Sequence, residues 1–379
     1  MSLLDEVSHQ ISLCSRCGYC RAACQTLEVK RSESWSTRGR ITLIDDFIGG
    51  DLKGGGDLSD RIYSCLLCGR CEVYCPPRVK VRETIEGARD ILVERGFAPR
   101  GAKSIAENVK NIGNPLGSPK DRVYGGVNHA SRGKTLLFRG CVASLRSVEN
   151  LRAAEELLRS ADYPFFEFSE EFCCGYPLEI LGFREDASDI YRKNYDVMSR
   201  AGVERVVTTC PSCYQAFRER YPRHIENFDL EASHIIDVYD ELMDEGRLTP
   251  LVKMDLRVSY QDPCALGRRS RYPDLARLLI ERIPGLRRVE PKDVGLMSRC
   301  CGGGSNLSLL FPEIHEGVRE GRIGEFMDGG CHIVITSCPT CLFTLREAAR
   351  GKAIAVDGLS TLLAASTGLR VNNIETRSF

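Results

Sequence analysis

Two stretches of the sequence with one cysteine spacing decide the fold of the N-terminal part of the chain. Residues 14–24 read CSRCGYCRAAC, and residues 65–76 read CLLCGRCEVYCP. Both have the spacing Cys-x2-Cys-x2-Cys-x3-Cys, and together they supply Cys14, Cys17, Cys20, Cys24, Cys65, Cys68, Cys71 and Cys75. Three cysteines at such short intervals can contact three irons of a compact cluster from one loop. The spacing therefore predicts iron–sulfur ligation.

The fourth cysteine of each stretch is predicted to serve the cluster of the other stretch. This exchange is the rule in the bacterial ferredoxin run. It predicts two [4Fe–4S] cubanes, one held by Cys14, Cys17, Cys20 and Cys75, and the other by Cys65, Cys68, Cys71 and Cys24. Zinc is disfavoured because its sites are usually built from separated cysteine pairs. Gly18 and Gly69, which follow the second cysteine of each stretch, would let the backbone approach the cluster closely.

The spacing between the two stretches favours a helical ferredoxin domain over the compact bacterial one. Forty residues separate Cys24 from Cys65, and Gln25 stands where a compact ferredoxin usually has proline. Residues 40–48 and 81–95 have the apolar pattern of amphipathic helices. This organisation resembles the helical ferredoxin domain of succinate dehydrogenase-type iron–sulfur subunits.

The second part of the chain contains a repeat of five cysteines. The two copies read C-x31-CC-x35-C-x2-C and C-x35-CC-x36-C-x2-C, and corresponding cysteines lie 123 to 128 residues apart. The first copy consists of Cys141, Cys173, Cys174, Cys210 and Cys213, and the second of Cys264, Cys300, Cys301, Cys338 and Cys341. Of the 19 cysteines only Cys331 remains, and we expect it to be a buried free thiol.

Each copy is predicted to form an α/β domain. Short apolar, β-branched runs end just before four of the cysteines, at residues 135–138, 203–208, 256–260 and 332–336, and helical patterns lie between them. Parallel units of this kind gather ligands at the carboxyl ends of their strands. We predict an α+β multidomain fold with an α-helical ferredoxin domain (1–100), a linker rich in Gly, Asn, Pro and Ser (101–133), and two repeated α/β domains (134–250 and 251–379).

The adjacent cysteines of each copy indicate an unusual cluster. Neighbouring side chains on an extended backbone point in different directions, so one simple cubane would rarely use both. Five thiolates at one site fit a further [4Fe–4S] cluster, with noncubane geometry as one option. The alternatives are a four-ligand cubane or zinc site beside which Cys173 or Cys300 is a small buried hydrophobe, and a site without metal.

Composition and charge exclude several function classes. The 379 residues include 52 Lys+Arg and 52 Asp+Glu, so we do not expect nucleic-acid binding by phosphate neutralisation. The length, the odd cysteine count and the absence of a secretory signal pattern disfavour a disulfide scaffold. No stretch approaches the roughly 18 apolar residues of a membrane span. We expect a reducing, anaerobic cytoplasm, with attachment to the cytoplasmic face of a membrane only through a partner.

The cysteine motifs resemble the signature of the heterodisulfide reductase catalytic family. FCCGYPL at residues 172–178 and TCPSCY at residues 209–214 fit that signature closely. A helical two-cluster ferredoxin placed ahead of two Cys-Cys-Gly domains resembles the D-type member of this family, found in methanogens, over residues 10–350. The architecture is also similar to the iron–sulfur subunits of glycolate oxidase, anaerobic glycerol-3-phosphate dehydrogenase and lactate utilisation enzymes.

The resemblance implies an oxidoreductase that acts on a sulfur group. The ferredoxin cubanes would relay electrons to the two repeats, whose ten cysteines would be catalytic as cluster ligands in the reduction of a disulfide such as CoM-S-S-CoB. The alternative is an electron-transfer component of a flavin-dependent glycolate, lactate or glycerol-3-phosphate dehydrogenase that passes electrons to a quinone or cytochrome.

Both hypotheses need a partner that donates electrons. No Gly-rich nucleotide fingerprint follows a predicted strand, so we expect flavin only on a partner. That partner would be a flavoprotein or a membrane cytochrome b-type subunit. Arg268, Arg269 and Arg271 follow Cys264 and are candidates for binding an anionic substrate group, unless they form a solvated basic loop.

Overall fold

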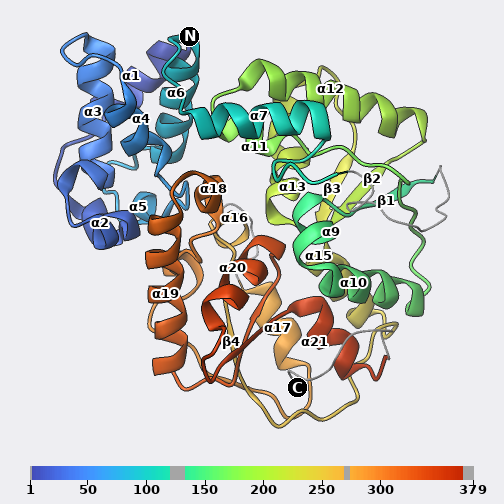
Figure 1. Cartoon of the computed structure of the whole chain (residues 1–379). Helices are drawn as coiled ribbons and strands as arrows, with labels where there is room; N and C mark the ends of the chain where they lie inside the picture. Colours follow the sequence, from blue (N-terminus) through green and yellow to red (C-terminus); the bar gives the residue numbers. More distant parts are fainter. Residues whose placement is uncertain (1, 120–132, 269–273, 370–379) are drawn as a thin grey trace.

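The computed structural model describes residues 2–119, 133–268 and 274–369, and it has three parts (Figure 1). A helical N-terminal part, blue in Figure 1, lies beside two α/β parts, coloured green to yellow and orange to red. One hydrophobic core runs through all three, because the buried residues Val7, Leu136 and Ile314 belong to the same cluster. The combination of a helical domain with two parallel sheets confirms the predicted α+β class.

The N-terminal part is built from helices around the cysteine loops. These are α1 (Leu3–Ser12), η1 (Tyr19–Ala23), α2 (Gln25–Lys30), η2 (Glu33–Trp35), α3 (Thr37–Gly49), α4 (Gly56–Tyr63), α5 (Arg70–Val73) and α6 (Val81–Glu94). Helices α3 and α6 cover the two amphipathic patterns of the sequence. Their buried residues include Ile41 and Ile44 of α3, and Ile85 and Ile91 of α6, which explains why these stretches are helical.

The predicted linker is wrong at its N-terminal end, because residues 101–112 belong to helix α7 (Arg100–Ile112). Ala102, Ile105, Ala106 and Val109 have the i, i+3, i+4, i+7 spacing of a helical face and are buried there. Helix α7 contacts three helices of the α/β parts, α11, α12 and α18. Gly113 ends the helix with a left-handed φ of 84°, and the run of Gly, Pro and Ser that suggested a linker follows from there.

The first α/β part has a three-stranded parallel sheet. Its order is β1 (Thr135–Phe138), β2 (Arg205–Thr208), β3 (Glu231–His234), with Thr135 opposite Arg205 and Arg205 opposite Glu231. The helices are α9 (Cys141–Arg146), α10 (Val148–Ser160), α11 (Tyr176–Ile180), α12 (Arg184–Arg200), α13 (Pro211–Gln215), η3 (Ala216–Arg220), α14 (Tyr221–His224) and α15 (Ile235–Asp244).

The second α/β part repeats this topology with one short edge strand added. Its parallel order is β5 (Arg287–Arg288), β4 (Arg257–Tyr260), β6 (Ile333–Thr336), β7 (Ala355–Gly358). Its helices are α16 (Cys264–Gly267), α17 (Leu275–Glu281), η4 (Gly295–Met297), η5 (Gly304–Asn306), α18 (Leu307–Leu310), α19 (Pro312–Asp328), α20 (Pro339–Ala349) and α21 (Leu359–Ser366). Strands β4, β6 and β7 correspond to β1, β2 and β3.

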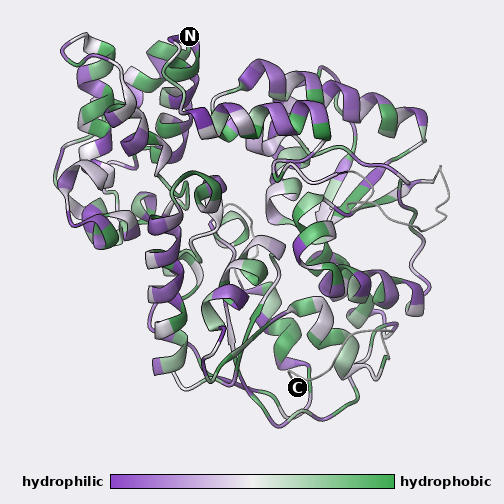
Figure 2. Cartoon of the chain, viewed as in Figure 1, coloured by the Kyte–Doolittle hydropathy of each residue, from purple (hydrophilic) through white to green (hydrophobic). Residues whose placement is uncertain are grey.

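Helices from the two α/β parts pack against each other. Helix α10 packs along α21, and α13 contacts α16. In Figure 2, α12 and α19 are mostly hydrophilic with shorter hydrophobic stretches, as expected for helices with one solvent-facing side. In the part of the chain that the structure describes, no helix combines the length and apolarity needed to cross a membrane.

Candidate iron–sulfur sites

The first group of cysteines lies at the surface of the helical part. Burial, followed by the neighbouring thiols of Cys14, Cys24, Cys75 and Cys17, raises the pKa of Cys20 to about 11. The Cys20 thiol therefore lies near Cys75 of the second motif as well as near Cys14, Cys17 and Cys24 of its own motif. Cys17 is exposed to solvent, whereas Cys14, Cys20 and Cys75 are partly buried.

The second group surrounds a cavity inside the helical part. Its lining includes Cys65, Cys68 and Cys71 together with Cys24 from the other motif. The Arg40 side chain, only 1% exposed, donates from Nη1 to Cys24 Sγ at 3.8 Å and from Nη2 to Thr26 Oγ1 at 2.9 Å. Burial opposes ionisation of Cys24, but the Arg40 charge and the Thr26 hydrogen bond outweigh it and lower the pKa of this thiol.

Glycines and arginines beside the two groups have distinct roles. Gly18 and Gly69 adopt left-handed φ angles of 86° and 73°, which glycine tolerates best. Arg16 and Arg21 form half-exposed ion pairs with Asp45 and Glu33. Arg70 is buried and instead reaches across to the second α/β part.

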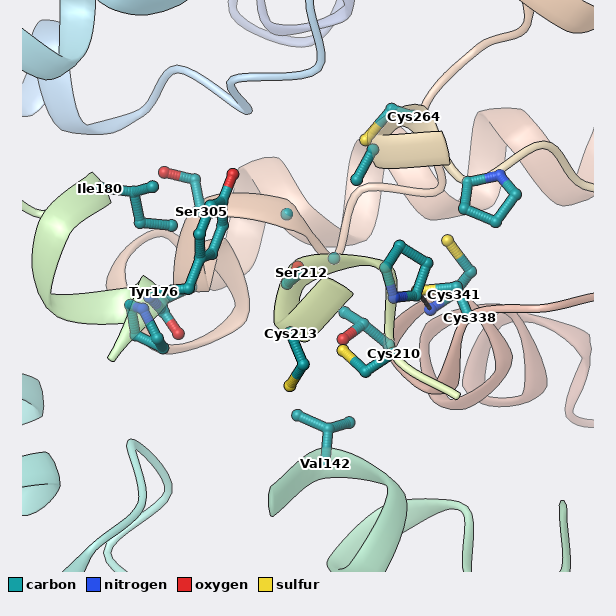
Figure 3. Close-up of a pocket in the computed structure, with 18 of the residues that line it drawn as sticks. Val142, Tyr176, Ile180, Cys210, Ser212, Cys213, Cys264, Ser305, Cys338 and Cys341 are labelled. Atoms are coloured by element: carbon teal, nitrogen blue, oxygen red, sulfur yellow. Dashed lines mark hydrogen bonds between the residues drawn. The ribbon is translucent and has the colours of Figure 1, made fainter. Parts of the chain in front are cut away.

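All ten cysteines of the two repeats line one cavity. Its lining includes Cys141, Cys173, Cys174, Cys210, Cys213, Cys264, Cys300, Cys301, Cys338 and Cys341. Figure 3 shows cysteines of both repeats around it, Cys210 and Cys213 from the first and Cys264, Cys338 and Cys341 from the second. The sequence predicts convergence within each repeat, but it does not predict that the two repeats share one space.

The strand ends deliver these cysteines to the N-termini of helices. Cys141 and Cys264 begin α9 and α16, just after β1 and β4. Cys210 and Cys338 are the N-cap residues of α13 and α20, and the following proline occupies the first helical turn in each case. Proline is favoured there because its fixed φ suits the first turn and no hydrogen bond is lost. A helix N-terminus favours the thiolate, the form that ligates metals, and the pKa values of Cys210 and Cys264 are lowered. The neighbouring Cys173 thiol and burial instead raise the pKa of Cys141 well above its usual value.

The Cys-Cys pairs point their two thiols at different neighbours. The Cys173 thiol lies close to those of Cys141 and Cys174, and the Cys174 thiol also lies close to that of Cys213. In the second repeat the Cys300 thiol contacts Cys264 and Cys301, while the Cys301 thiol also contacts Cys341. The first cysteine of each pair is therefore part of the thiol cluster, not an isolated apolar side chain.

The geometry common to both repeats includes a left-handed glycine after the pair, Gly175 with φ 83° and Gly302 with φ 93°. A Cβ atom on Gly175 would lie 2.5 Å from the Tyr191 ring. We expect Gly175→Ala to lower the free energy of unfolding by about 2 kcal/mol or more, through backbone strain plus this clash. Denaturant titration under anaerobic conditions measures this change in the free energy of unfolding.

The matched control for this prediction is Gly202→Ala. Gly202 has a similar φ of 76°, but a Cβ atom there meets nothing within 4 Å. Gly202→Ala should lower the free energy of unfolding by about 1 kcal/mol, through backbone strain alone. Equal effects of the two substitutions would contradict the packing role assigned to Gly175.

Several buried residues that support the sites have no counterpart in the sequence analysis. The Glu171 carboxylate accepts hydrogen bonds from the backbone N–H groups of Arg139 (3.0 Å) and Gly140 (3.1 Å), which fixes the turn before Cys141. The His315 ring contacts the Gly302 carbonyl at 3.0 Å, just beyond the second Cys-Cys pair. Glu171 lies two residues before Cys173, but a single acidic residue gives no periodic signal.

The second ferredoxin group touches the second repeat directly. The Cys68 thiol lies close to that of Cys300, and this neighbour, ahead of the Arg268 charge and against the effect of burial, lowers the pKa of Cys68 to about 6. Arg268 donates from Nη1 to the Cys68 carbonyl at 3.0 Å and from Nε to the Leu296 carbonyl at 2.9 Å. Arg268 thus joins two domains; Arg269 and Arg271 lie outside the described residues.

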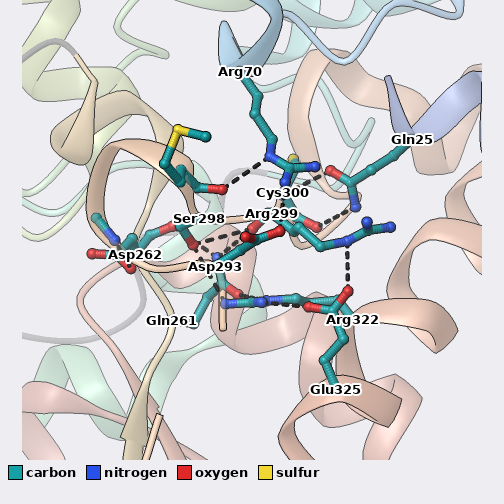
Figure 4. A network of polar contacts seen from close by, with 12 residues as sticks. Gln25, Arg70, Gln261, Asp262, Asp293, Ser298, Arg299, Cys300, Arg322 and Glu325 are labelled. Carbon is teal, nitrogen blue, oxygen red and sulfur yellow. Dashed lines mark hydrogen bonds and ion pairs between the residues drawn. The ribbon is translucent and has the colours of Figure 1, made fainter. Parts of the chain in front are cut away.

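Arg70 adds a further contact at this junction (Figure 4). It donates to the Met297 carbonyl at 2.9 Å and pairs with Asp293 at 2.5 Å, although it directly precedes Cys71.

Cys331 takes no part in the thiol clusters. It is 6% exposed, and its thiol donates to the Phe326 carbonyl at 3.5 Å.

Comparison with protein-family models agrees with these three parts. A 4Fe–4S dicluster domain matches residues 10–79, and a cysteine-rich domain matches twice, at residues 135–218 and 258–346. The D-type component of dihydromethanophenazine:CoB–CoM heterodisulfide reductase from Methanosarcina acetivorans is 25% identical over 96% of this chain and 95% of its own length. The chain is an iron–sulfur protein of the heterodisulfide reductase family.

Other relatives of this heterodisulfide reductase-family protein are similar to it over about three quarters of the chain. The B-type component of the CoM/CoB fumarate reductase from Methanothermobacter marburgensis is 25% identical over 78% of the chain and 59% of its own length. An EtfAB:quinone oxidoreductase from Syntrophomonas wolfei is 24% identical over 76% of the chain and 43% of its own length. These names support an oxidoreductase role in electron transfer.

A protein of known structure has a similar fold. A hypothetical protein from Helicobacter pylori superposes with a TM-score of 0.53 and 12% sequence identity, covering 79% of this chain and 60% of that one. At this identity the similarity concerns the fold alone.

Proposed function

We propose that this protein reduces a disulfide in the cavity shared by its two cysteine-rich repeats. The observation that carries the proposal is the placement of all ten repeat cysteines around one space. Two redox sites that face a common cavity suit a substrate with two sulfur atoms. The names of the heterodisulfide reductase relatives favour the mixed disulfide of coenzyme M and coenzyme B.

The proposed ligand sets follow the four groups of thiols. Two cubanes would be held by Cys14, Cys17, Cys20 and Cys75, and by Cys24, Cys65, Cys68 and Cys71. Five thiols of each repeat would hold one further [4Fe–4S] cluster, with noncubane geometry. The donors fit such groups because each set consists of thiols alone, the ligand type that selects iron–sulfur clusters. Bound clusters would supply one-electron storage and transfer.

The lining of the cavity suits the sulfur–sulfur bond of a disulfide. Among the described residues that line it, none is charged, and Val142, Tyr176 and Ile180 present apolar surface. Such walls exclude water and accept the weakly polar sulfur–sulfur bond. The reaction R–S–S–R′ + 2e⁻ + 2H⁺ → R–SH + R′–SH requires two electrons. These would arrive singly through the ferredoxin part.

The positions of the cysteine groups suggest the order in which their clusters would receive electrons. The first ferredoxin group is exposed at Cys17, and the second contacts the second repeat through Cys68 and Cys300. An external donor would therefore reduce the first group, from which electrons pass inward. We propose a flavoprotein or a membrane cytochrome b-type protein as that donor, with flavin on the partner and any attachment to the cytoplasmic face of a membrane through it.

A second function is favoured by the quinone oxidoreductase relative. In it the chain would collect electrons from a flavin-dependent dehydrogenase and pass them to a quinone or cytochrome. The same four groups would serve, but the shared cavity would then hold no substrate. The two functions differ in whether a disulfide is consumed at the cavity.

An anaerobic assay of the reconstituted protein tests the proposal. With reduced viologen and the mixed disulfide, we expect two thiols per disulfide and about sixteen irons per chain, four per cluster. The Cys301→Ala variant should lose most of this turnover while reduction of the ferredoxin groups continues, because Cys301 lies only in the second repeat. No disulfide consumption by a fully loaded chain, with rapid electron transfer to a quinone, would favour the second function.

A further inference from the structure

The Gln25 side chain makes a two-way contact between domains. Its Nε2 donates to the Cys300 carbonyl at 3.1 Å, and its Oε1 accepts from the Cys300 backbone N–H at 2.8 Å. Gln25 is 3% exposed and directly follows Cys24 in the sequence. The contact therefore joins the residue next to a cysteine of the ferredoxin part to a cysteine of the second repeat. Figure 4 shows Gln25 reaching Cys300 from the helical part of the chain.

We infer that Gln25 is a positioning residue that couples the ferredoxin part to the second repeat for electron transfer. The inference rests on the proposed function, in which Cys24 and Cys300 ligate different clusters. The peptide bond between Cys24 and Gln25, the Gln25 side chain and its two hydrogen bonds then connect Cys24 to Cys300. Gln25 would fix the backbone of Cys300 and with it the direction of the Cys300 thiol toward Cys68.

The chemistry of the glutamine side chain explains its presence at this position. A side-chain amide carries a donor and an acceptor in one plane, so it can pair with both polar groups of a backbone residue. Proline, the residue usual here in compact ferredoxins and present as Pro76 after the second motif, offers neither group. The departure from the ferredoxin pattern at residue 25 thus coincides with the domain junction.

The other polar contacts of helix α2 with the second repeat are more exposed. Lys30 pairs with Glu313 at 3.1 Å, with side chains 28% and 56% exposed. Glu28 pairs with Arg299, and its side chain is 42% exposed. Exposed ion pairs contribute little, whereas removing one partner of a buried hydrogen bond leaves polar groups unsatisfied. Gln25 is therefore the residue of α2 whose loss should change the junction most.

The test follows electron flow inside the holoprotein. The ferredoxin clusters are reduced with substoichiometric dithionite, and freeze-quench EPR then times the appearance of reduced clusters in the repeats. We expect Gln25→Ala to keep its iron and sulfide but to slow this step by about 10-fold or more, the scale on which loss of a partner of a metal ligand lowers activity. The matched control Glu313→Ala, on the same junction, should transfer at the wild-type rate.

A second variant separates positioning from mere folding. Gln25→Glu has nearly the same shape and keeps the acceptor for the Cys300 N–H, but it loses the donor. We expect it to slow transfer as well and to lower the midpoint potential of the second-repeat cluster, since a buried negative charge disfavours reduction.

The outcomes distinguish this inference from the proposed function. Wild-type transfer rates in Gln25→Ala at full iron content would overturn the role of Gln25. If Gln25→Ala loses iron, Gln25→Glu decides: slow transfer supports the role, and a wild-type rate and potential overturn it. A wild-type protein with far fewer than about sixteen irons would instead refute the proposed ligand sets.

Discussion

The Cys24→Ala variant is expected to lose the cluster of the second motif and to keep the cluster of its own motif. Cys24 lines the same cavity as Cys65, Cys68 and Cys71, to which Arg40 and Thr26 also contribute. The iron content should fall from about sixteen to about twelve per chain. Because this group is the one that touches the second repeat, reduction of the repeats by an external donor should cease.

Double variants identify which cluster has been lost. Cys24→Ala combined with Cys65→Ala should lose no more iron than either substitution alone, since both remove one cluster. Cys24→Ala combined with Cys14→Ala should lose about eight irons, because two independent clusters are affected. The opposite pattern would show that each motif keeps its own fourth ligand. Cys331→Ala, outside all four groups, should keep every iron.

The Arg89→Ala variant is expected to cause the largest loss of stability. Arg89 is fully buried in α6 and binds all three parts of the chain. It donates to the carbonyls of Ile62, Tyr63 and Cys65, to the Ile180 carbonyl at 2.7 Å and to Ser305 Oγ at 2.7 Å. Truncation would leave several buried acceptors unsatisfied and open a cavity, so unfolding should become easier by about 3 kcal/mol or more.

The control for Arg89 is an exposed arginine. Arg288 forms one ion pair with Glu281 at 2.9 Å, and the two side chains are 35% and 48% exposed. Its replacement by alanine should change the free energy of unfolding by no more than about 0.5 kcal/mol. Anaerobic denaturant titration of both variants gives the comparison. An Arg89→Ala protein as stable as Arg288→Ala would show that the domains do not depend on this buried contact.

Much of the fold could be predicted from local patterns. The strands before Cys141 and Cys210 are short β-branched runs, and α3 and α6 have clear helical periodicity. Strands β3 and β7 escape prediction because EASH and AVDG are neither strongly apolar nor alternating. Helix α7 escapes it because polar neighbours obscure a regular apolar face.

The candidate sites show the same limit at longer range. Parallel α/β units place residues at the carboxyl ends of strands, so the convergence of five cysteines in each repeat follows from sequence. The shared cavity does not, because it depends on how α10 packs along α21 and how α13 meets α16. Gln25, Arg89 and Glu171 act over long sequence separations, and a single sequence contains no pattern that reveals such contacts.

The exposure of Cys17 has a consequence for how the protein would be damaged by oxidation. Oxidants in solution reach the most accessible thiolates first, and the thiols of the shared cavity are shielded by comparison. Brief contact with air should therefore damage the outermost cluster while the inner ones survive. Such a protein would no longer accept electrons from the proposed donor, but the clusters at the shared cavity would be intact. Repair would then require rebuilding only one cluster at the surface.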